Sequence, residues 1–513
     1  MRRWRSRIAV VCVLAGLVAS CTPGPSPRPE IVVNDAPAPS RGPDEQATEV
    51  PPLEEMPQDT EWRPCPIEIQ TMLDEQPPPE WLGIECQRLN SVLDSPYAPG
   101  RGVARVQLLR AGHGAVPIAV VNDIGGLPGT VYAARLAATL PQEFFDTFSL
   151  IGMDRRGTGG SAAANCLPQE VRDALLDTDP AGLPIDTWLD SAQTAGQQCS
   201  IQLEEQLPAL DTWRTAADLD NLRTALGQTR LNGIGHGEGS RVLSVFADRW
   251  PDQVGRMVLD GLPDPTQDAA IAQEGVAKGA EAAFDAFAED CVSRGCELGE
   301  DPKQTLLELL GEVRANPLVG VHGEITAGTV LHAVRIGLAD RRGWPALATA
   351  LADAGNGDPT GVAAILEPVR YGSPVRVPTM DGTLVTTCND TKTRLSPERI
   401  EQLGTDWSER FPLFGPLSAQ RLAQCGPWTV PNQPLPTPTA NGAPPIVVLG
   451  TAADAVTPHE GAERAAQQLD SGVFLSWQGS GHGALGFSPC ATDAAVGFLT
   501  EATVPRDGTV CPP

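Results

Sequence analysis

The chain has 513 residues, of which 41% are hydrophobic, and a formal net charge of −27. This length is enough for a large core and two subdomains, and the composition is that of a soluble protein. Such an acidic balance disfavours nucleic acid or an anionic lipid surface as a binding partner.

The N-terminus has the pattern of an export signal. Four arginines, at positions 2, 3, 5 and 7, precede a short apolar run over 8–18, so residues 1–20 are predicted to be a signal peptide. The run is too short for a comfortable transmembrane helix. Residues 18–21 (VASC) resemble a bacterial lipobox, in which cleavage leaves Cys21 to carry lipid; the alternative is ordinary secretory cleavage near the same place. We therefore expect an extracytoplasmic protein anchored to the cell membrane through Cys21.

Residues 21–60 are rich in Pro, Ser, Asp and Glu and contain few apolar side chains. A segment of this composition cannot bury a core, which predicts a disordered tether between the anchor and a folded body.

Ten cysteines follow the tether, an even number in a chain predicted to be exported, which favours disulfides. They are Cys65, Cys86, Cys166, Cys199, Cys291, Cys296, Cys388, Cys425, Cys490 and Cys511. Spacing alone does not determine the connectivity, but neighbours fall into five local couples, so we predict sequential pairing. No CxxC or His-x-x-x-His pattern accompanies them, and we expect neither a metal nor a cofactor.

Strand and helix patterns alternate over the first part of the body. After an irregular lead-in at 62–86, strands are predicted at 104–109, 118–121, 148–153 and 256–259, with helices at 131–139 and 216–226. A strand, a tight turn and a helix are predicted within 231–251. This alternation predicts an α/β fold with a mostly parallel sheet covered on both faces.

The alternation stops near Pro263, and a mainly helical block extends to about Pro436. Strands at 446–449 and 473–477 and helices at 459–469 and 492–499 then complete the sheet domain. The domains predicted after the tether are thus a core at 61–262, an inserted helical cap at 263–436, and the rest of the core at 437–513.

The junction of the strand and helix at 231–251 carries the pattern on which function depends. In α/β-hydrolases this junction is the nucleophile elbow, G-x-S-x-G, which holds the catalytic serine. Here the five residues read Gly235, His236, Gly237, Glu238 and Gly239, so glycine stands in the serine position. Shifting the frame to Ser240 breaks the motif.

Several further segments resemble the actinobacterial tripeptidyl-aminopeptidase-like serine hydrolases, exported relatives of proline iminopeptidases. They are 62–65 (WRPC), 154–161 (DRRGTGGS), 225–227 (ALG), 251–261 (PDQVGRMVLDG), 488–490 (SPC) and 508–511 (GTVC). The resemblance implies a capped α/β-hydrolase fold. It also implies cleavage of short peptides from a free N-terminus, or of esters.

The resemblance also implies the positions of the catalytic groups. The acid matches Asp454 and the histidine matches His482. The nucleophile position is Gly237, whether it is counted forward from the segment at 225–227 or back from Pro251. N–H groups of Glu238 and of the loop at Gly125 and Gly126 would form the oxyanion hole. That loop, at 122–129, departs from the denser glycine–proline run of the family by inserting Ile124 and Leu127.

Glycine at position 237 has no hydroxyl, so no acyl-enzyme can form there. It also tolerates the strained backbone of an elbow, and we expect Gly237→Ser to lower the melting temperature. Three interpretations remain open. In the first, the chain is a degenerate hydrolase (a pseudoenzyme) that binds a peptide or small-molecule ligand. In the second, it is a hydrolase that uses His482 and Asp454 on water or with a displaced nucleophile such as Ser240. In the third, it is a structural envelope protein with an occluded pocket.

Overall fold

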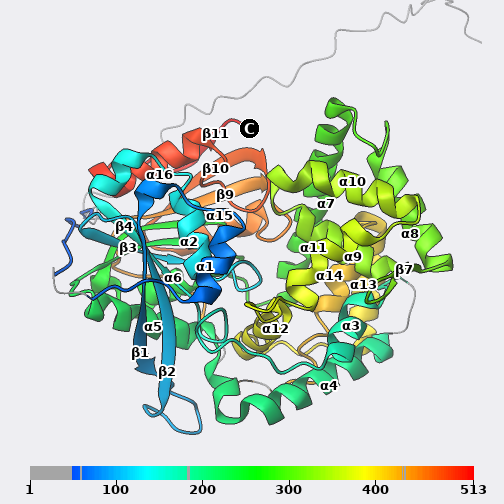
Figure 1. Ribbon diagram of the computed structural model, residues 1–513, viewed down its shortest axis with the longest axis horizontal. Coiled ribbons are helices and arrows are strands. Elements are labelled where there is room, and N and C mark those ends of the chain that lie inside the picture. The colour runs from blue at the N-terminus through cyan, green and yellow to red at the C-terminus, as the bar shows by residue number, and fades with distance from the viewer. Residues whose placement is uncertain (1–48, 58–60, 182–184, 430, 432–434) are drawn as a thin grey trace, which may run out of the picture. The chain divides into compact units, whose positions relative to one another are not determined.

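The structure, a computed structural model, describes residues 49–57, 61–181, 185–429, 431 and 435–513 (Figure 1). The predicted signal peptide, the Cys21 anchor and most of the predicted tether lie outside these residues. All described residues belong to one compact unit.

Among the described residues, nine strands form one sheet in the order β1-β2-β4-β3-β5-β6-β9-β10-β11. The strands are β1 (Ile84–Val92), β2 (Val103–Ala111), β3 (Val116–Val121), β4 (Phe148–Met153), β5 (Leu231–His236), β6 (Val254–Asp260), β9 (Ile446–Ala453), β10 (Gly472–Ser480) and β11 (Thr509–Cys511). The pairs β1–β2 and β2–β4 are antiparallel, and every later pair is parallel. The predicted α/β class with a mostly parallel sheet is confirmed.

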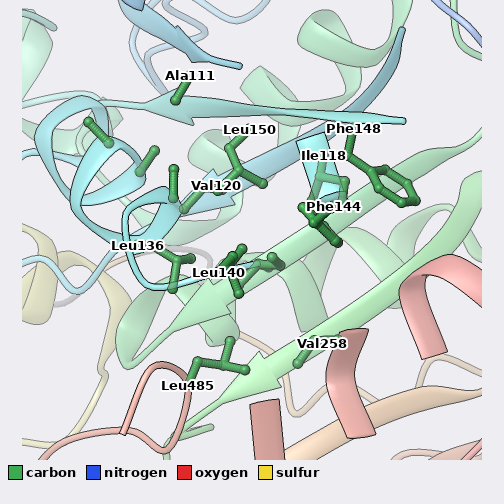
Figure 2. Close-up of a cluster of buried hydrophobic side chains, with 14 of the residues drawn as sticks. Ala111, Ile118, Val120, Leu136, Leu140, Phe144, Phe148, Leu150, Val258 and Leu485 are labelled. Atoms are coloured by element: carbon green, nitrogen blue, oxygen red, sulfur yellow. The ribbon is translucent and has the colours of Figure 1, made fainter. Parts of the chain in front are cut away.

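Helices cover both faces of this sheet. One face packs against α1 (Ile67–Asp74), α2 (Gly129–Ala137) and α16 (Pro489–Glu501), and the other against α5 (Thr212–Ala225), α6 (Glu238–Arg249) and α15 (His459–Gln468). Successive side chains of a strand point to opposite faces, so Ile118 and Val120 belong to the first layer while Ala119 and Val121 belong to the second. Figure 2 shows Ile118, Val120 and Leu150 in the first layer with Leu136 of α2. Burial on both sides explains why the central strands are apolar throughout.

The segment between β6 and β9 is mainly helical and is referred to as the cap. Its elements are α7 (Ala269–Arg294), α8 (Pro302–Ala315), α9 (Ala327–Gly337), α10 (Trp344–Gly355), α11 (Thr360–Arg370), α12 (Thr379–Asp390), α13 (Pro397–Arg410), α14 (Gly415–Arg421) and the short hairpin β7 (Leu318–Gly320) with β8 (Gly323–Ile325). The cap has its own apolar clusters, separate from those that line the sheet.

The predicted domain division needs a correction, because α3 (Gln169–Asp177) and α4 (Ile185–Leu203) also pack into the cap (Figure 1). Trp188 of α4 shares a buried cluster with Trp407 of α13. Arg172 of α3 forms a buried ion pair of 2.8 Å with Asp381 of α12. The cap is thus built from two insertions into the sheet domain, one after β4 and one after β6.

Two other segments differ from the expectation. The lead-in at 62–86, predicted to be irregular, contains α1 and the start of β1. Residues 49–57, predicted to belong to a disordered tether, lie against the core instead: the Met56 N–H donates to the Ala115 carbonyl (2.8 Å), and Arg256 Nε donates to the Pro51 carbonyl (3.2 Å).

The sequential disulfide pairing is confirmed. The bonds are Cys65–Cys86, Cys166–Cys199, Cys291–Cys296, Cys388–Cys425 and Cys490–Cys511. Within the described ranges, each helix is too short or too polar to cross a bilayer.

Candidate active site

The turn between β5 and α6 has the geometry of a nucleophile elbow. Gly237 is the residue between the strand and the helix. Its φ of 55° and ψ of −126° form a backbone conformation that residues other than glycine rarely adopt. Gly239 is required for a different reason, since a Cβ there would lie 2.0 Å from the Val121 carbonyl oxygen. The sequence pattern of glycines therefore marks a turn in which helix and sheet approach very closely.

The space that a serine side chain would occupy at position 237 is already filled. A Cβ built on Gly237 would lie 2.8 Å from His482 Nε2 and 3.0 Å from both Cβ and Cγ of Asp123. It points at the ring nitrogen that faces the serine in a catalytic triad, so the register derived from the sequence agrees with the geometry. The Asp123 side chain, however, crosses the same space.

The two remaining triad positions lie together as their motifs predicted. Asp454 follows β9 and His482 follows β10, and His482 Nδ1 lies 3.0 Å from Asp454 Oδ2. The buried carboxylate of Asp454 also accepts the N–H groups of Val456 (2.7 Å) and Thr457 (2.9 Å) and the Thr457 hydroxyl (2.8 Å). These bonds fix the carboxylate, which in turn orients the imidazole.

Asp123 is the residue at this site that sequence reasoning missed. It follows β3 in the predicted oxyanion loop, and its Oδ2 lies 3.5 Å from His482 Nε2. Its Oδ1 accepts the N–H groups of Ile124 (2.8 Å) and Glu238 (3.3 Å). The Glu238 N–H is the donor that the sequence assigned to the oxyanion hole, so the carboxylate of Asp123 occupies the place predicted for an oxyanion.

His482 thus lies between two carboxylates, and their charges control its protonation. Burial alone would lower the pKa of His482, but the negative charges of Asp454 and Asp123 raise it well above its ordinary value. Burial alone would raise the pKa of Asp123, but contact with His482 holds it far below its ordinary range. A protonated imidazole has no lone pair to accept a proton.

The other predicted groups lie close by. The Gly126 N–H donates to the Asp123 carbonyl (3.3 Å), which closes the turn of the oxyanion loop, and a Cβ on Gly125 would face Thr383 of α12. Their role in stabilising an oxyanion stays a prediction. Ser240 is buried in α6, and its hydroxyl donates to the Asp260 carbonyl (3.0 Å), so it is not directed at His482.

Two residues that flank Gly237 are also held by neighbours. The His236 ring is stacked on Tyr132 with centroids 4.9 Å apart and lies 4.3 Å from the His482 ring. Glu238 pairs with Arg241 at 3.2 Å. Both residues therefore take part in packing or ion pairing on the wall of the site.

A cavity of about 870 Å³ lies over these groups, between core and cap. This volume is in the range of small-molecule sites. Its core wall includes Tyr132, His236 and His482, and its cap wall includes Arg335, Thr383 and Arg421. In the part of the chain that the structure describes, no cluster of three or more His, Cys, Asp or Glu side chains is arranged to hold a metal ion.

Comparison with known proteins agrees with this architecture. The family profile for the α/β-hydrolase fold matches residues 119–323, and that for TAP-like protein matches residues 411–511. The chain is 27% identical to the serine protease Hip1 of Mycobacterium tuberculosis over 469 residues, which cover 84% of this chain and 87% of the relative. It is 26% identical to the tripeptidyl aminopeptidase of Streptomyces coelicolor over 384 residues, covering 71% and 70% of the two chains.

Among solved structures, a hydrolase from Pseudomonas aeruginosa PA01 matches with a TM-score of 0.32 and 16% identity, covering 80% of this chain and 98% of that one. The family profiles, the curated relatives and the order of strands around the elbow agree: this chain belongs to the TAP-like α/β-hydrolases.

Proposed function

We propose that this protein is a catalytically degenerate hydrolase that binds a peptide or another small ligand in the cavity beneath its cap. One observation carries the proposal: the Asp123 carboxylate fills the space beside Gly237 where a serine side chain would lie. A serine hydrolase needs a hydroxyl at the elbow and a neutral histidine to take its proton. The first is absent at Gly237, and the ion pair with Asp123 opposes the second.

The cavity distinguishes binding from a purely structural role. A scaffold protein was expected to have an occluded or unstructured pocket, whereas an 870 Å³ cavity with both polar and apolar walls lies over the site. Such a cavity suits a small ligand, so a purely structural role is disfavoured.

The proposal includes export and anchoring through lipidated Cys21. Its support is the basic, apolar and lipobox sequence of residues 2–21. Detergent partitioning and mass spectrometry of the N-terminal peptide test this part. Wild type should enter the detergent phase with a diacylglyceryl mass on Cys21, and Cys21→Ala should be found in the aqueous phase.

The intact contact between Asp454 and His482 favours a second candidate, an active hydrolase without the elbow serine. His482 would then deprotonate water only after Asp123 moves away from Nε2. The Asp123 carboxylate lies 3.5 Å from this nitrogen, whereas the Ser240 hydroxyl donates a hydrogen bond to a backbone carbonyl.

A hydrolase screen separates the two candidates. Wild type, His482→Ala and Asp123→Asn are assayed with aminoacyl, tripeptidyl and short-ester substrates, and each is treated with a fluorophosphonate probe. We expect no labelling and no turnover that depends on His482, together with saturable ligand binding by calorimetry. Turnover by wild type that is lost in His482→Ala would overturn the proposal of a degenerate hydrolase. In that case, the turnover of Asp123→Asn would show whether Asp123 assists or blocks the reaction.

A further inference from the structure

The charged groups around the cavity are not balanced locally. Its carboxylates all have cationic partners: Glu238 pairs with Arg241, Asp340 with Arg342, Asp264 with Arg464, and Asp123 with His482. Two arginines of the cap wall, Arg335 of α9 and Arg421 of α14, are different. Within the described chain, neither guanidinium has a carboxylate at salt-bridge distance or a hydrogen-bond acceptor, and Arg335 Nε is buried without a partner.

These two cations are close enough to influence each other. Burial lowers the pKa of Arg335 to about 9, and the charge of Arg421 acts in the same direction. Burial also lowers the pKa of Arg421. A guanidinium is protonated at neutral pH, so an unneutralised pair of cations faces the cavity. Placing such charges out of bulk water without an anion is unfavourable, and an anionic ligand would offset the cost.

The neighbouring His332 supplies no compensation. It lies one turn before Arg335 on α9, is buried, and its Nε2 has no partner among the described residues. Burial and then the charges of Arg335 and Arg421 lower its pKa well below the ordinary value, so it is neutral. The acids whose charges act on the two arginines are Asp123 and Glu238, and both are engaged elsewhere.

The rest of the cavity wall is partly apolar. Val276 and Ile336 from the cap and Leu485 and Phe487 from the core line it together with Tyr132. A ligand that suits this wall has an apolar body and an anionic group. Guanidinium matches a carboxylate through two parallel hydrogen bonds.

We propose that Arg335 and Arg421 form a carboxylate-binding pair, so that the ligand is a small organic acid with an apolar body. The class includes short peptides with a free C-terminal carboxylate and fatty acids. The inference rests on the proposed binding function and specifies its ligand. It excludes a peptide that enters with its cationic N-terminus next to the cap arginines, because two unpaired guanidiniums repel an ammonium group.

Calorimetric binding with matched acid and amide probes tests the pair. N-acetyl-dileucine is compared with its C-terminal amide, and decanoate with decanamide, on the full-length wild type and on Arg335→Met, Arg421→Met and the double variant. Arg342→Met is the matched control, because Arg342 lines the same cavity but is paired with Asp340 at 3.0 Å.

We expect at least one acid to bind wild type about tenfold to a hundredfold more tightly than its amide, the effect of charged hydrogen bonds. The pair of probes that shows this preference identifies the source of the carboxylate. The preference should fall in both single variants, vanish in the double variant and persist in Arg342→Met. Removing an unpaired cation should also raise the melting temperature of the ligand-free protein in Arg335→Met and Arg421→Met.

Equal affinity for acids and amides, or a preference that survives in the double variant, would overturn the carboxylate pair while leaving ligand binding intact. Absence of binding by all four probes would also overturn it. Absence of binding combined with turnover that depends on His482 would overturn the proposed function as well.

Discussion

Restoring the missing serine should not restore a working site, because Asp123 occupies its space. In Gly237→Ser the new Cβ would lie 2.8 to 3.0 Å from His482 Nε2 and from Cβ and Cγ of Asp123. These contacts are about 0.4 to 0.6 Å shorter than ordinary van der Waals contact at 3.4 Å. Overpacking of this kind costs about 1–3 kcal/mol. The φ of 55° adds backbone strain, which is about 1–3 kcal/mol for a non-glycine residue.

The two costs separate in a double-mutant cycle with Asp123→Gly, which removes both of the Asp123 atoms that the serine would meet. Backbone strain and the 2.8 Å contact with His482 Nε2 are the same in either background, whereas overpacking against Asp123 disappears. The Asp123 share of the overpacking cost is about 1–2 kcal/mol, so Gly237→Ser should lower the free energy of unfolding by about that much more in the wild-type background than in the Asp123→Gly background. Denaturant titration followed by tryptophan fluorescence measures this quantity, and the chain has 10 tryptophans.

Gly237→Ala is the matched control, since it introduces the same Cβ without the hydroxyl and should show the same coupling. Fluorophosphonate labelling gives a second measurement, and we expect it only in the double variant that combines Gly237→Ser with Asp123→Gly. If Gly237→Ser lowers the free energy of unfolding by the same amount in both backgrounds, within about 0.5 kcal/mol, Asp123 does not block the serine position and the reasoning is wrong. Labelling of the Gly237→Ser single variant would refute it as well.

Two further predictions concern stability. Burial raises the pKa of Asp390 to about 7 from 3.8. Between these pH values the folded protein binds more protons than the unfolded chain. The free energy of unfolding therefore falls as pH rises through this window. Asp390→Asn should therefore stabilise the protein at pH 8, by up to about 4 kcal/mol, and have little effect at pH 4; equal effects at both pH values in denaturant titrations would contradict this. Replacing the Cys388–Cys425 disulfide, which closes 37 residues, with alanines should cost about 4 kcal/mol, and replacing Cys291–Cys296, which closes 5, about 2 kcal/mol. Equal losses in parallel denaturant titrations would count against a loop-entropy origin.

The sequence predicted the central sheet because its strands are buried on both faces and therefore appear as apolar runs. The strand at Phe148–Met153 has the predicted bounds, and all six of its residues are buried. β1 was missed because it is an edge strand: among the strands of the described sheet it pairs with β2 alone, and Glu85, Arg88 and Asn90 interrupt its apolar pattern. A half-exposed edge strand resembles an irregular segment when the sequence is the only information.

The limits of the cap were only partly predictable for a related reason. The helical patterns of α3 and α4 precede the elbow in the chain, and periodicity shows which face of a helix is apolar but not which partner covers it. Trp188 and Leu175 find their partners in α12 and α13, about 200 residues later in the sequence. Only the tertiary structure shows that the insertion after β4 belongs to the cap.

The elbow and the positions of Asp454 and His482 were predictable because each lies in a local motif at the end of a strand. Asp123 was not, although it belongs to a loop whose departure from the family pattern is visible in the sequence. The residues that depart from the family pattern are Ile124 and Leu127. The effect on the site, however, comes from the direction of the Asp123 side chain, which precedes them. Its contacts with Gly237 and His482 join segments more than 100 residues apart.

Gly237 and Asp123 are best understood as one coupled change. A carboxylate in the oxyanion position needs a vacant space, hydrogen-bond donors and a cation. The absence of a side chain at 237 provides the space, the N–H groups of Ile124 and Glu238 provide the donors, and protonated His482 provides the cation. Conversely, a protonated histidine has lost its function as a base, so a serine would gain little from being beside it. The same backbone that supports proton transfer in a hydrolase here stabilises a buried ion pair, and on the proposed function we expect that reversing either residue alone leaves the other to block catalysis.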